Sequence, residues 1–423
     1  MSGEPLRIAL LTYRGNPRSG GQGIYVRLLS RELVELGHHV DVWSGQPYPE
    51  LCDGVGMVKV PSLDLWNDQA FFRFPTAREL RDPINVSEYA RTVTGGFPEP
   101  FTFSQRVVRT LSRANGSGPK YDILHDNQTL APELLRLRSK IPLVATIHHP
   151  MTRDRRIALE SSHTLRERYG LVRWYSFLPK QLRMSRRLDR VMTVSEASAD
   201  DIAGEYGIAR ERIRVVGIGI DTTVFHPKPD IQREPDLLVA TLSADSAIKG
   251  FRYLLEALAI LRRERPALRL VVVGSPGRKT HTAKLIQKLG LQDAVQFLGK
   301  VEADEIARLY ARATLAVVAS LYEGFGLPAG EAMACEVPLV ATTGGALPEV
   351  VGRDGTTGVL VEPGSGEALA RGIRDLLDAP EKRRGMGLAA KKRVESMFTW
   401  RRAAERRVEV YREAIAERVS VAC

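Results

Sequence analysis

Short apolar runs alternate with amphipathic stretches along almost the whole chain, and this alternation constrains the fold more than any other feature. Residues 6–13 ("LRIALLTY") form an apolar run, and residues 24–37 ("IYVRLLSRELVELG") follow with apolar positions three or four apart. The same order recurs at 236–243 ("DLLVATLS") and 250–264 ("GFRYLLEALAILRRE"). Strands and helices in this order build parallel sheets with crossover helices. The pattern therefore predicts an α/β protein with doubly wound sheets.

A proline-rich segment divides this pattern into two series. Residues 221–236 contain Pro227, Pro229 and Pro235, and no strand or helix pattern continues through them. A chain of 423 residues has the length of two domains. We predict an N-terminal domain over 1–225, a C-terminal domain over 226–397, and a last helix over 398–420. Residues 62–119 interrupt the first series, and we interpret them as an irregular insertion near the active face of that domain.

Composition excludes several classes of protein. No stretch approaches the ~18 apolar residues of a membrane-spanning helix. No basic region precedes the first apolar run and no small-residue cleavage site follows it, which favours a buried strand over a signal peptide. The cysteines, Cys52, Cys335 and Cys423, are too scattered for a disulfide framework or a zinc site. We therefore expect a cytoplasmic protein.

The positive charge is concentrated in one segment. The net charge is +11, and residues 151–190 carry eleven Lys or Arg against four Asp or Glu. Trp174, Tyr175 and Phe177 lie in the same segment. Basic residues with interleaved aromatics suit an anionic membrane surface or a nucleic acid, while a solvated helix pair is the plainer alternative. We do not expect nucleic acid to bind, because this surplus lies away from the glycine-rich turns that follow the strands.

One of these turns has the composition of an anion-binding site. The stretch "EGFGLPAGE" (323–331) follows the predicted strand 314–320, and Pro328 fits the first turn of a helix after it. Backbone amides and the positive end of a helix dipole attract anions at such a place. Glu323 and Glu331 would repel a phosphate, so we expect them to bind neutral hydroxyl groups beside it. The alternative is an ordinary capped helix with surface glutamates.

Two further glycine turns occupy equivalent positions. "TTGGALPEV" (342–350) follows another predicted strand, and "GNPRSGGQG" (15–23) follows the first strand of the chain. None of the turns matches a phosphate loop or a well-placed dinucleotide fingerprint. Ligands of doubly wound sheets bind beyond the carboxyl ends of the strands. Two such domains facing a central cleft would suit the joining of a donor to an acceptor.

Three histidines end predicted strands of the first domain. His148 and His149 follow one strand, and we expect one or both to face the cleft; His125 ends the preceding strand and is a weaker candidate for contact with an acceptor. Neighbouring residues of a strand point to opposite faces, and no Asp-x-Asp pair lies at a strand end. We therefore expect no metal site.

The motifs together resemble a known family. "VMTVSEASADDI", "VVGIGIDTTVF", "YEGFGLPAGEAMACEVPLVATTGGALPEVV" and "GTTGVLVEP" are similar to the retaining, nucleotide-sugar-dependent glycosyltransferases of family 4 (glycosyl transferases group 1), which have the GT-B fold. The similarity is strongest over 190–362. It extends to the N-terminal Gly-Gly and to "TWRRAAERRVEVY", the helix that in this fold crosses back onto the first domain. The insertion at 62–119 has no counterpart.

The resemblance implies a role for each matching residue. It implies that Lys249 neutralises the diphosphate leaving group, that Glu323 lies by the transferred sugar, and that His148 lies near the reacting centre. Glu331 would bind the nucleotide ribose. The other implied donor contacts are backbone groups, at Gly20 and Gly21, at Val301 for the base, and at Gly324, Phe325, Gly326 and Leu327 for the sugar and diphosphate; His125 and His149 are assigned to the acceptor.

The sequence departs from the family pattern at one position. The family usually carries an arginine five or six residues before the lysine, and here that region reads "TLSADSAIKG". Arg278 is the nearest substitute by topology, and Lys279 is another. If neither reaches the diphosphate, the enzyme is impaired or uses an unusual donor.

The activity that the resemblance implies is transfer of a sugar from a UDP- or GDP-sugar with retention of configuration, without metal or cofactor. The basic segment 151–190 favours a lipid-linked acceptor at the cytoplasmic membrane face, and a soluble acceptor is the alternative. A phosphorylase of the same architecture and a non-catalytic or impaired nucleotide-sugar-binding protein remain as other classes, although no convincing lysine site for pyridoxal phosphate is found.

Overall fold

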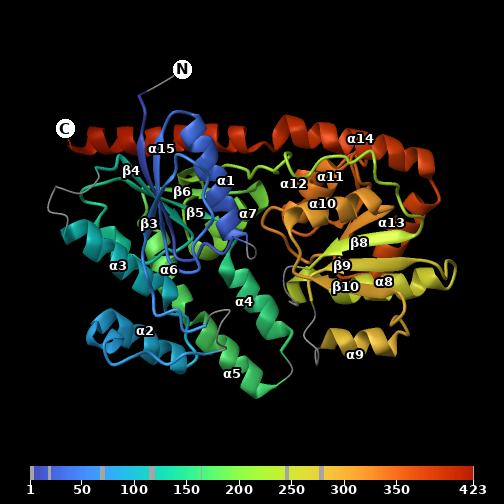
Figure 1. Cartoon of the computed structure of the whole chain (residues 1–423), viewed down its shortest axis with the longest axis horizontal. Helices are drawn as coiled ribbons and strands as arrows, with labels where there is room; N and C mark the ends of the chain where they lie inside the picture. Colours follow the sequence, from blue (N-terminus) through green and yellow to red (C-terminus); the bar gives the residue numbers. More distant parts are fainter. Residues whose placement is uncertain are drawn as a thin grey trace. The chain divides into compact units, whose positions relative to one another are not determined.

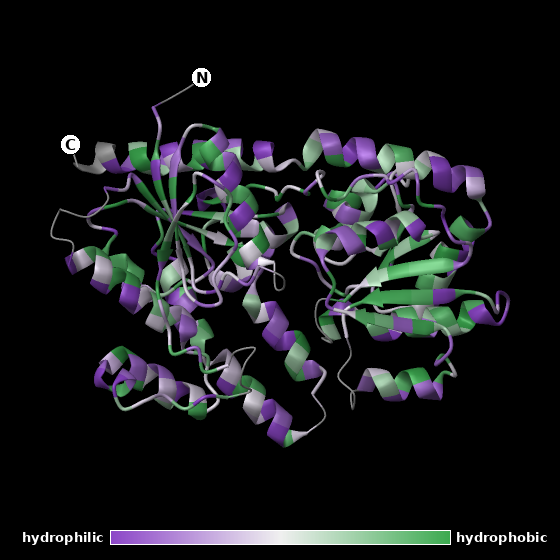
Figure 2. Ribbon diagram, in the orientation of Figure 1, coloured by the Kyte–Doolittle hydropathy of each residue, from purple (hydrophilic) through white to green (hydrophobic). Residues whose placement is uncertain are grey.

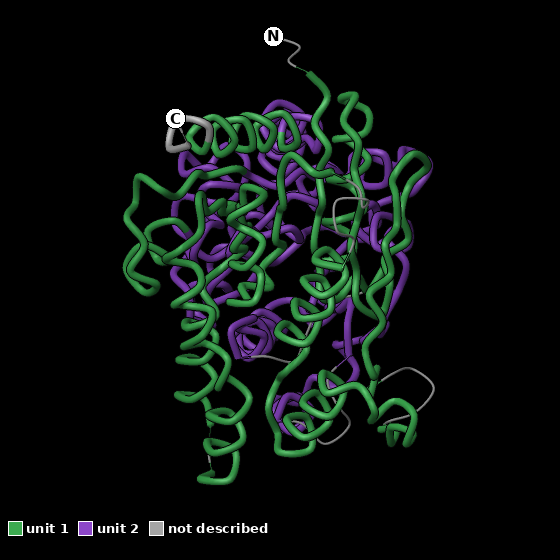
Figure 3. Tube along the Cα trace, turned by 90° about the vertical axis from the view of Figure 1, so that its left-hand side faces the viewer, with its two compact units in different colours: residues 1–194, 199–216, 403–423 green, residues 195–198, 217–402 purple. Residues whose placement is uncertain are grey.

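The computed structural model describes residues 4–17, 21–66, 72–113, 120–162, 164–242, 247–275 and 281–422. They form two compact units (Figure 3). Unit 1 comprises residues 1–194, 199–216 and 403–423, and unit 2 comprises residues 195–198 and 217–402. The contact boundary thus lies between Val216 and Gly217, slightly before the boundary predicted at 225/226.

Unit 1 is built on a seven-stranded parallel sheet with the order β3-β2-β1-β4-β5-β6-β7 (Figure 1). Its central strands are almost wholly buried apolar runs, as expected for a sheet covered on both faces. The order reverses between β1 and β4, which pair in parallel with Ile8 opposite Ile123. The strands are β1 (Arg7–Thr12), β2 (His39–Ser44), β3 (Gly56–Lys59), β4 (Ile123–Asn127), β5 (Leu143–Ile147), β6 (Arg190–Thr193) and β7 (Ile213–Val215).

The helices of unit 1 include two in the segment that we predicted to be irregular. Pro83 lies in the first turn of α2, after Asp82, whose carboxylate accepts a hydrogen bond from the amide of Ile84. A proline there starts a helix and does not break it, so the prediction was wrong for the described part of 62–119. The helices are α1 (Gln22–Glu35), α2 (Pro83–Val93), α3 (Glu99–Arg113), α4 (Met151–Glu160), α5 (Leu165–Trp174), α6 (Leu178–Ser185), α7 (Glu196–Tyr206) and α15 (Trp400–Ala422).

The terminal helix α15 packs into unit 1 from Ala403 onward. The Arg407 side chain is fully buried, and its Nε donates to the hydroxyl of Tyr25 at 2.9 Å. Its guanidinium also donates to the carbonyl of Val216. Burying a cation is costly unless its donors are satisfied, so these bonds fix the position of the helix on α1 and the end of β7.

Unit 2 has a six-stranded parallel sheet with the order β10-β9-β8-β11-β12-β13. Hydrophobic residues dominate its strands β8 and β9 (Figure 2). The order reverses between β8 and β11, and ligands of open α/β sheets bind beyond the carboxyl ends of the strands at such a reversal. The strands are β8 (Leu237–Thr241), β9 (Arg269–Val273), β10 (Val295–Gly299), β11 (Leu315–Val318), β12 (Leu339–Thr342) and β13 (Val359–Val361).

Seven α-helices of unit 2 are described besides the shared ends of α7 and α15. They are α8 (Phe251–Arg262), α9 (His281–Lys288), α10 (Ala303–Arg312), α11 (Leu327–Ala334), α12 (Leu347–Val351), α13 (Gly366–Leu377) and α14 (Pro380–Met397). A short 3-10 helix, η5 (Ala247–Lys249), follows β8. The prediction of two doubly wound parallel α/β domains is confirmed.

Candidate active site

The turn after β11 leads directly into the N-terminus of α11. Gly326 is the residue before this helix and has φ 103°, a backbone conformation that favours glycine. A Cβ atom at this position would lie 2.8 Å from Cδ2 of Leu347. Both constraints require glycine at position 326. The backbone of the turn lies at the carboxyl edge of the sheet.

The backbone amides of this turn are open donors. In the described part of the chain, the amides of Gly324, Phe325 and Gly326 have no hydrogen-bond partner. Leu327 opens α11, where the first amides lack an acceptor within the helix. Four consecutive donors at the positive end of a helix can bind the oxygens of a phosphate. The turn therefore has the geometry of an anion site.

Two serine hydroxyls hold the turn from behind. Ser195 Oγ donates to the carbonyl of Gly324 at 2.7 Å, and Ser198 Oγ reaches the same oxygen at 3.2 Å. The Glu349 carboxylate accepts from the amides of Glu196 and Ala197, both at 2.8 Å, and so fixes the segment that carries the serines. Sequence reasoning missed these roles, because the serines lie more than 120 residues from Gly324 along the chain.

Lys249 and Glu323 form an ion pair beside the turn. Lys249 Nζ lies 2.8 Å from Glu323 Oε1, and the side chains are 21% and 11% exposed. Ser320 Oγ donates to the same carboxylate oxygen at 2.7 Å. Lys249 ends η5, the 3-10 helix that follows β8, and Glu323 lies in the turn after β11. β8 and β11 are the neighbouring strands between which the strand order reverses. The structure thus brings together two residues that the resemblance assigned to the reacting sugar phosphate.

Glu331 lies one turn inside α11 and is half-buried. Among the residues that the structure describes, its carboxyl group has no hydrogen bond or ion pair. Burial raises the pKa of its carboxyl group to about 7. A half-buried carboxyl without a partner is costly in the absence of ligand, because the ionised form is poorly solvated. It is suited to accept hydrogen bonds from hydroxyl groups.

In unit 1, His148 lies at the end of β5 and is held by its neighbours. Its Nε2 lies 2.8 Å from Asn127 Oδ1, and its ring meets the Tyr25 ring edge-on with centroids 4.7 Å apart. Burial, with the positive charges of His149 and Arg407, lowers the pKa of His148 to about 3. His148 is therefore neutral near pH 7, when it can position a hydroxyl group but is not a cationic acid.

His125 occupies a different environment from the one predicted. It is fully buried in β4, and its Nδ1 and Nε2 lie 2.7 Å from the hydroxyls of Tyr411 and Thr146. Burial lowers its pKa well below the usual value. With both ring nitrogens engaged and no exposed surface, His125 joins α15 to the sheet and does not reach an acceptor in this structure. His149 is partly exposed and lies 2.9 Å from the Asp154 carboxylate.

The remaining predicted residues lie at strand ends or outside the described residues. Gly21 precedes α1 with φ 74°, and a Cβ there would meet no atom within 4 Å. Val301 follows β10 in the loop before α10. Gly20, Arg278 and Lys279 lie outside the described residues. The structure thus leaves the substitute for the family arginine as a prediction.

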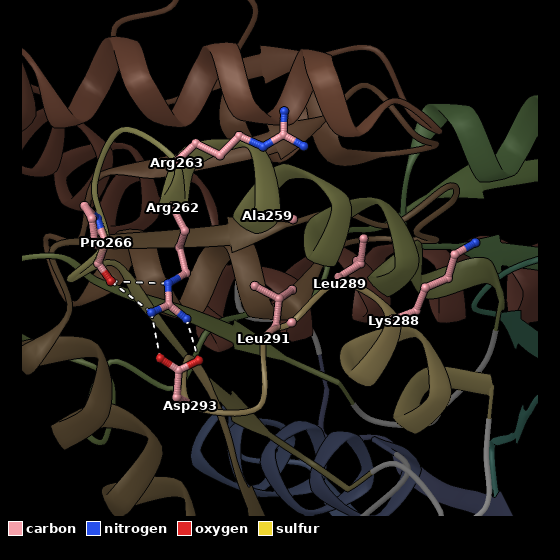
Figure 4. Close-up of a pocket in the computed structure, with 9 residues that line it drawn as sticks. Ala259, Arg262, Arg263, Pro266, Lys288, Leu289, Leu291 and Asp293 are labelled. Atoms are coloured by element: carbon pink, nitrogen blue, oxygen red, sulfur yellow. Dashed lines mark hydrogen bonds and ion pairs between the residues drawn. The ribbon is translucent and has the colours of Figure 1, made fainter.

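Neither a metal cluster nor the pocket beside α8 and α9 adds to this site in the part of the chain that the structure describes. In the described ranges, no group of three or more His, Cys, Asp or Glu could hold a metal ion. A pocket of about 500 Å³ lies beside α8 and α9 (Figure 4). Its Arg262 is already paired with Asp293 at 2.7 Å and bonded to the carbonyl of Pro266, and the pocket contains none of the predicted site residues.

Family models match both halves of the chain. The model for "Glycosyl transferases group 1" matches residues 225–393, and the model for "Glycosyltransferase Family 4" matches residues 19–224. An MMP α-(1→4)-mannosyltransferase from Mycolicibacterium hassiacum is 45% identical over 415 residues, covering 97% of this chain and 99% of that protein. A D-inositol 3-phosphate glycosyltransferase from Salinispora tropica is 27% identical, covering 98% and 86% of the two chains.

Solved structures agree on the fold. Sucrose-phosphate synthase from Thermosynechococcus elongatus superposes with a TM-score of 0.74 at 24% identity, covering 97% of this chain and 100% of the other. HepE from Anabaena, in complex with UDP and glucose, gives 0.67 at 20% identity, covering 96% and 99%. These likenesses show the GT-B fold. The chain therefore belongs to the glycosyl transferases of group 1, family 4, and is a glycosyltransferase.

Proposed function

We propose that this enzyme transfers a mannosyl unit from a nucleoside diphosphate sugar to a saccharide acceptor, with retention of the anomeric configuration. The observation that carries the proposal is the row of open amides from Gly324 to Leu327 beside Lys249. A diphosphate gains negative charge as it leaves, and donors placed in advance stabilise that charge. The name of the relative at 45% identity suggests mannose and an α-(1→4) linkage. The HepE complexes with UDP and with UDP-glucose support a nucleotide-sugar donor.

Donor binding would rearrange the ion pair. Lys249 Nζ would turn from Glu323 to the diphosphate oxygens, and the released Glu323 carboxylate would accept from a sugar hydroxyl. The bond from the anomeric carbon to the diphosphate breaks, and the acceptor oxygen attacks the same face. The proton of the acceptor hydroxyl passes to the departing phosphate oxygen. This step needs neither an enzymic nucleophile nor a metal.

The other residues would bind without reacting. Glu331 would accept from the ribose hydroxyls, and the backbone at Val301 would contact the base. In unit 1, Gly21 would approach a phosphate closely, because it has no side chain of its own and the space around its Cβ position is open. Neutral His148 would position the reacting hydroxyl, and His149, oriented by Asp154, would contact the acceptor.

We also propose that unit 1 contacts an anionic membrane surface from the cytoplasmic side. On α5, Leu165, Tyr169 and Val172 are 86%, 70% and 47% exposed, and their spacing places them on one face. Arg166 and Arg168 lie on the same helix, within the basic segment 151–190. No helix among the described residues is long and apolar enough to span a bilayer. Flotation with phosphatidylglycerol vesicles tests this contact. We expect the protein to float at low salt, and flotation should fall at high salt and in the variant Leu165→Ser with Tyr169→Ser. Absence of flotation at low salt would refute the contact.

The activity is tested by incubating the enzyme with a panel of UDP- and GDP-sugars in EDTA, with and without mono- and oligosaccharide acceptors. We expect slow release of nucleoside diphosphate from one donor alone, and an α-linked product by NMR when an acceptor is present. A β-linked product from an α-linked donor, or activity that depends on added metal, would overturn the mechanism. Donor binding without any turnover would favour an impaired binding protein.

A further inference from the structure

A second pocket lies in unit 1, among the helices that replace the predicted irregular insertion. Its volume is about 210 Å³, below the roughly 300–1,000 Å³ of pockets that enclose a whole ligand. A pocket of this size can hold one group of a larger molecule, but not a whole ligand of that kind. The lining residues come from the end of α2, the loop after it, the start of α3, the end of α5, the connection to α6 and the start of α6: Arg91, Gly96, Phe97, Pro98, Phe101, Arg173, Ser176, Phe177 and Lys180.

The pocket has cationic side chains and no acidic one. Arg91, Arg173 and Lys180 line it, and no Asp or Glu does. Lys180 Nζ lies 5.1 Å from the centroid of the Phe101 ring. The Arg91 side chain has no hydrogen bond or ion pair with any described residue. An anion in the pocket would be attracted by each of these side chains.

Arg173 is held in place before any ligand binds. Its Nε and Nη2 donate to the carbonyl of Thr94 at 3.2 and 3.0 Å, and Nη2 also donates to the Thr94 hydroxyl. These bonds leave Nη1 without a hydrogen-bond partner in the described chain. A guanidinium fixed in this way loses little side-chain entropy when it binds an anion.

Aromatic rings form the apolar part of the pocket. Phe97 packs against Trp174 with centroids 4.9 Å apart and against Phe177 at 5.7 Å. Phe101 and Phe177 are only 3% and 5% exposed, so the rings are fixed by the core. Rigid aromatic faces beside cations suit a ring that carries a negative charge.

The pocket is linked to the carboxyl end of β1. The Phe97 ring meets the Tyr13 ring edge-on at 5.9 Å, and two residues later Glu99 pairs with Arg14 at 2.8 Å. Tyr13 and Arg14 follow β1 directly, at the same edge of the parallel sheet as His148 and His149, which in our proposal meet the acceptor. A saccharide lying along this edge could therefore place a neighbouring group in the pocket.

We propose that this pocket is an acceptor subsite for a carboxylate or phosphate group carried on a ring of the acceptor. The assignment to the acceptor rests on the proposed function of unit 1, whereas the binding of an anion does not. Arg173 and Arg91 donate to the anion, Lys180 neutralises it, and Phe97 packs on the ring. None of these residues belongs to the donor site.

The test is calorimetric titration with phenyl phosphate, phenyl β-D-glucuronide and the neutral phenyl β-D-glucoside. The pocket variant is Arg91→Gln with Lys180→Gln, and the matched control is Lys120→Gln with Lys140→Gln, which removes the same charge from exposed positions of unit 1 outside segment 151–190. We expect the pocket variant to bind one or both anions about 10-fold more weakly than the control does, because Arg91 and Lys180 are exposed and solvent weakens each of their two contacts. The glucoside should bind weakly to all three proteins.

Equal anion affinity in the two variants, or a glucoside that binds as tightly as the anions, would overturn the proposal. Flotation with phosphatidylglycerol vesicles separates a lipid headgroup from a soluble anion. Loss of flotation in the pocket variant, with unchanged titrations, would assign these cations to the membrane and also overturn it. Donor hydrolysis should be the same in all three proteins, so its absence would count against the proposed function alone.

Discussion

The polar groups at the carboxyl ends of the strands have different hydrogen-bond partners in the two units. In unit 2, the amides of Gly324 to Gly326 and the carboxyl group of Glu331 have no partner in the described chain. In unit 1, the polar side chains at the strand ends are bonded to one another: His148 to Asn127, and the Asp126 carboxylate to the amides of Thr129 and Leu130. The strand ends of unit 2 thus have hydrogen-bonding groups available for a ligand. At the strand ends of unit 1, these polar groups already have partners within the chain.

The difference matches two kinds of recognition, that of a diphosphate and that of an acceptor. A diphosphate can be recognised by backbone donors that any sequence supplies, provided that glycine allows the turn. An acceptor must be recognised by side chains, and in our proposal unit 1 supplies some of these from α2, α3, α5 and α6. We therefore expect substitutions in unit 2 to change donor chemistry, and substitutions in unit 1 to change stability or acceptor choice.

The largest expected effect is on turnover. Lys249→Ala removes the cation that would meet the leaving group, and loss of one preorganised group of this kind costs about 10²–10³ in kcat. Steady-state kinetics should show this loss with a smaller change in KM, while Lys288→Ala on the exposed face of α9 should behave as wild type. Unchanged turnover in the Lys249 variant would remove the residue from the mechanism.

A change in the core of unit 1 should affect stability alone. Tyr411→Phe deprives buried His125 Nδ1 of its partner, which costs about 1–3 kcal/mol. The melting temperature should fall, and the affinity for the nucleoside diphosphate should stay constant. Tyr169→Phe on exposed α5 is the control. Loss of donor affinity in the Tyr411 variant would mean that the two edges are not separate in function.

Glu331→Gln should weaken donor binding by about 10-fold, the effect of one charge-assisted hydrogen bond.

The same substitution should also change the dependence of stability on pH. The folded-state pKa of Glu331 is raised from 4.5 to about 7, so in that interval the folded chain keeps a proton that the unfolded chain has lost. This contribution to stability is complete below pH 4.5 and is lost as the pH rises through about 7.

The melting temperature of Glu331→Gln relative to wild type should therefore rise between these two pH values, because the variant has no proton to lose. A pH-independent difference would show that the carboxyl group is well solvated. Titration of the nucleoside diphosphate at constant pH measures the separate effect on binding.

The smallest effect concerns the support of the glycine turn. Ser195→Ala removes a 2.7 Å hydrogen bond to the Gly324 carbonyl, leaving Ser198 to hold it, and one such bond is worth about 0.5–1.5 kcal/mol. Donor affinity should fall slightly in the single variant and further in Ser195→Ala with Ser198→Ala. Equal affinities in all three proteins would show that α11 alone fixes the turn.

The sequence predicted those parts of the site that are local. The glycine turn at 323–331 was readable because strand, turn and helix follow one another within a few residues. The burial of His125 was not, since its partner Tyr411 lies 286 residues away on α15. The support of Gly324 by Ser195 spans 129 residues and has no local signal. The helices of the insertion were missed, although Pro83 and Pro100 lie in the first turns of α2 and α3, where a proline is tolerated.

The most direct test of the central claim is hydrogen exchange of the backbone at residues 322–330, with UDP or GDP added in EDTA. The open amides of Gly324, Phe325 and Gly326 should exchange fast in the free enzyme and become protected when the diphosphate binds. The account predicts this protection in wild type and a weaker effect at the same nucleotide concentration in Lys249→Ala. Saturating nucleotide with no protection of this segment would contradict it.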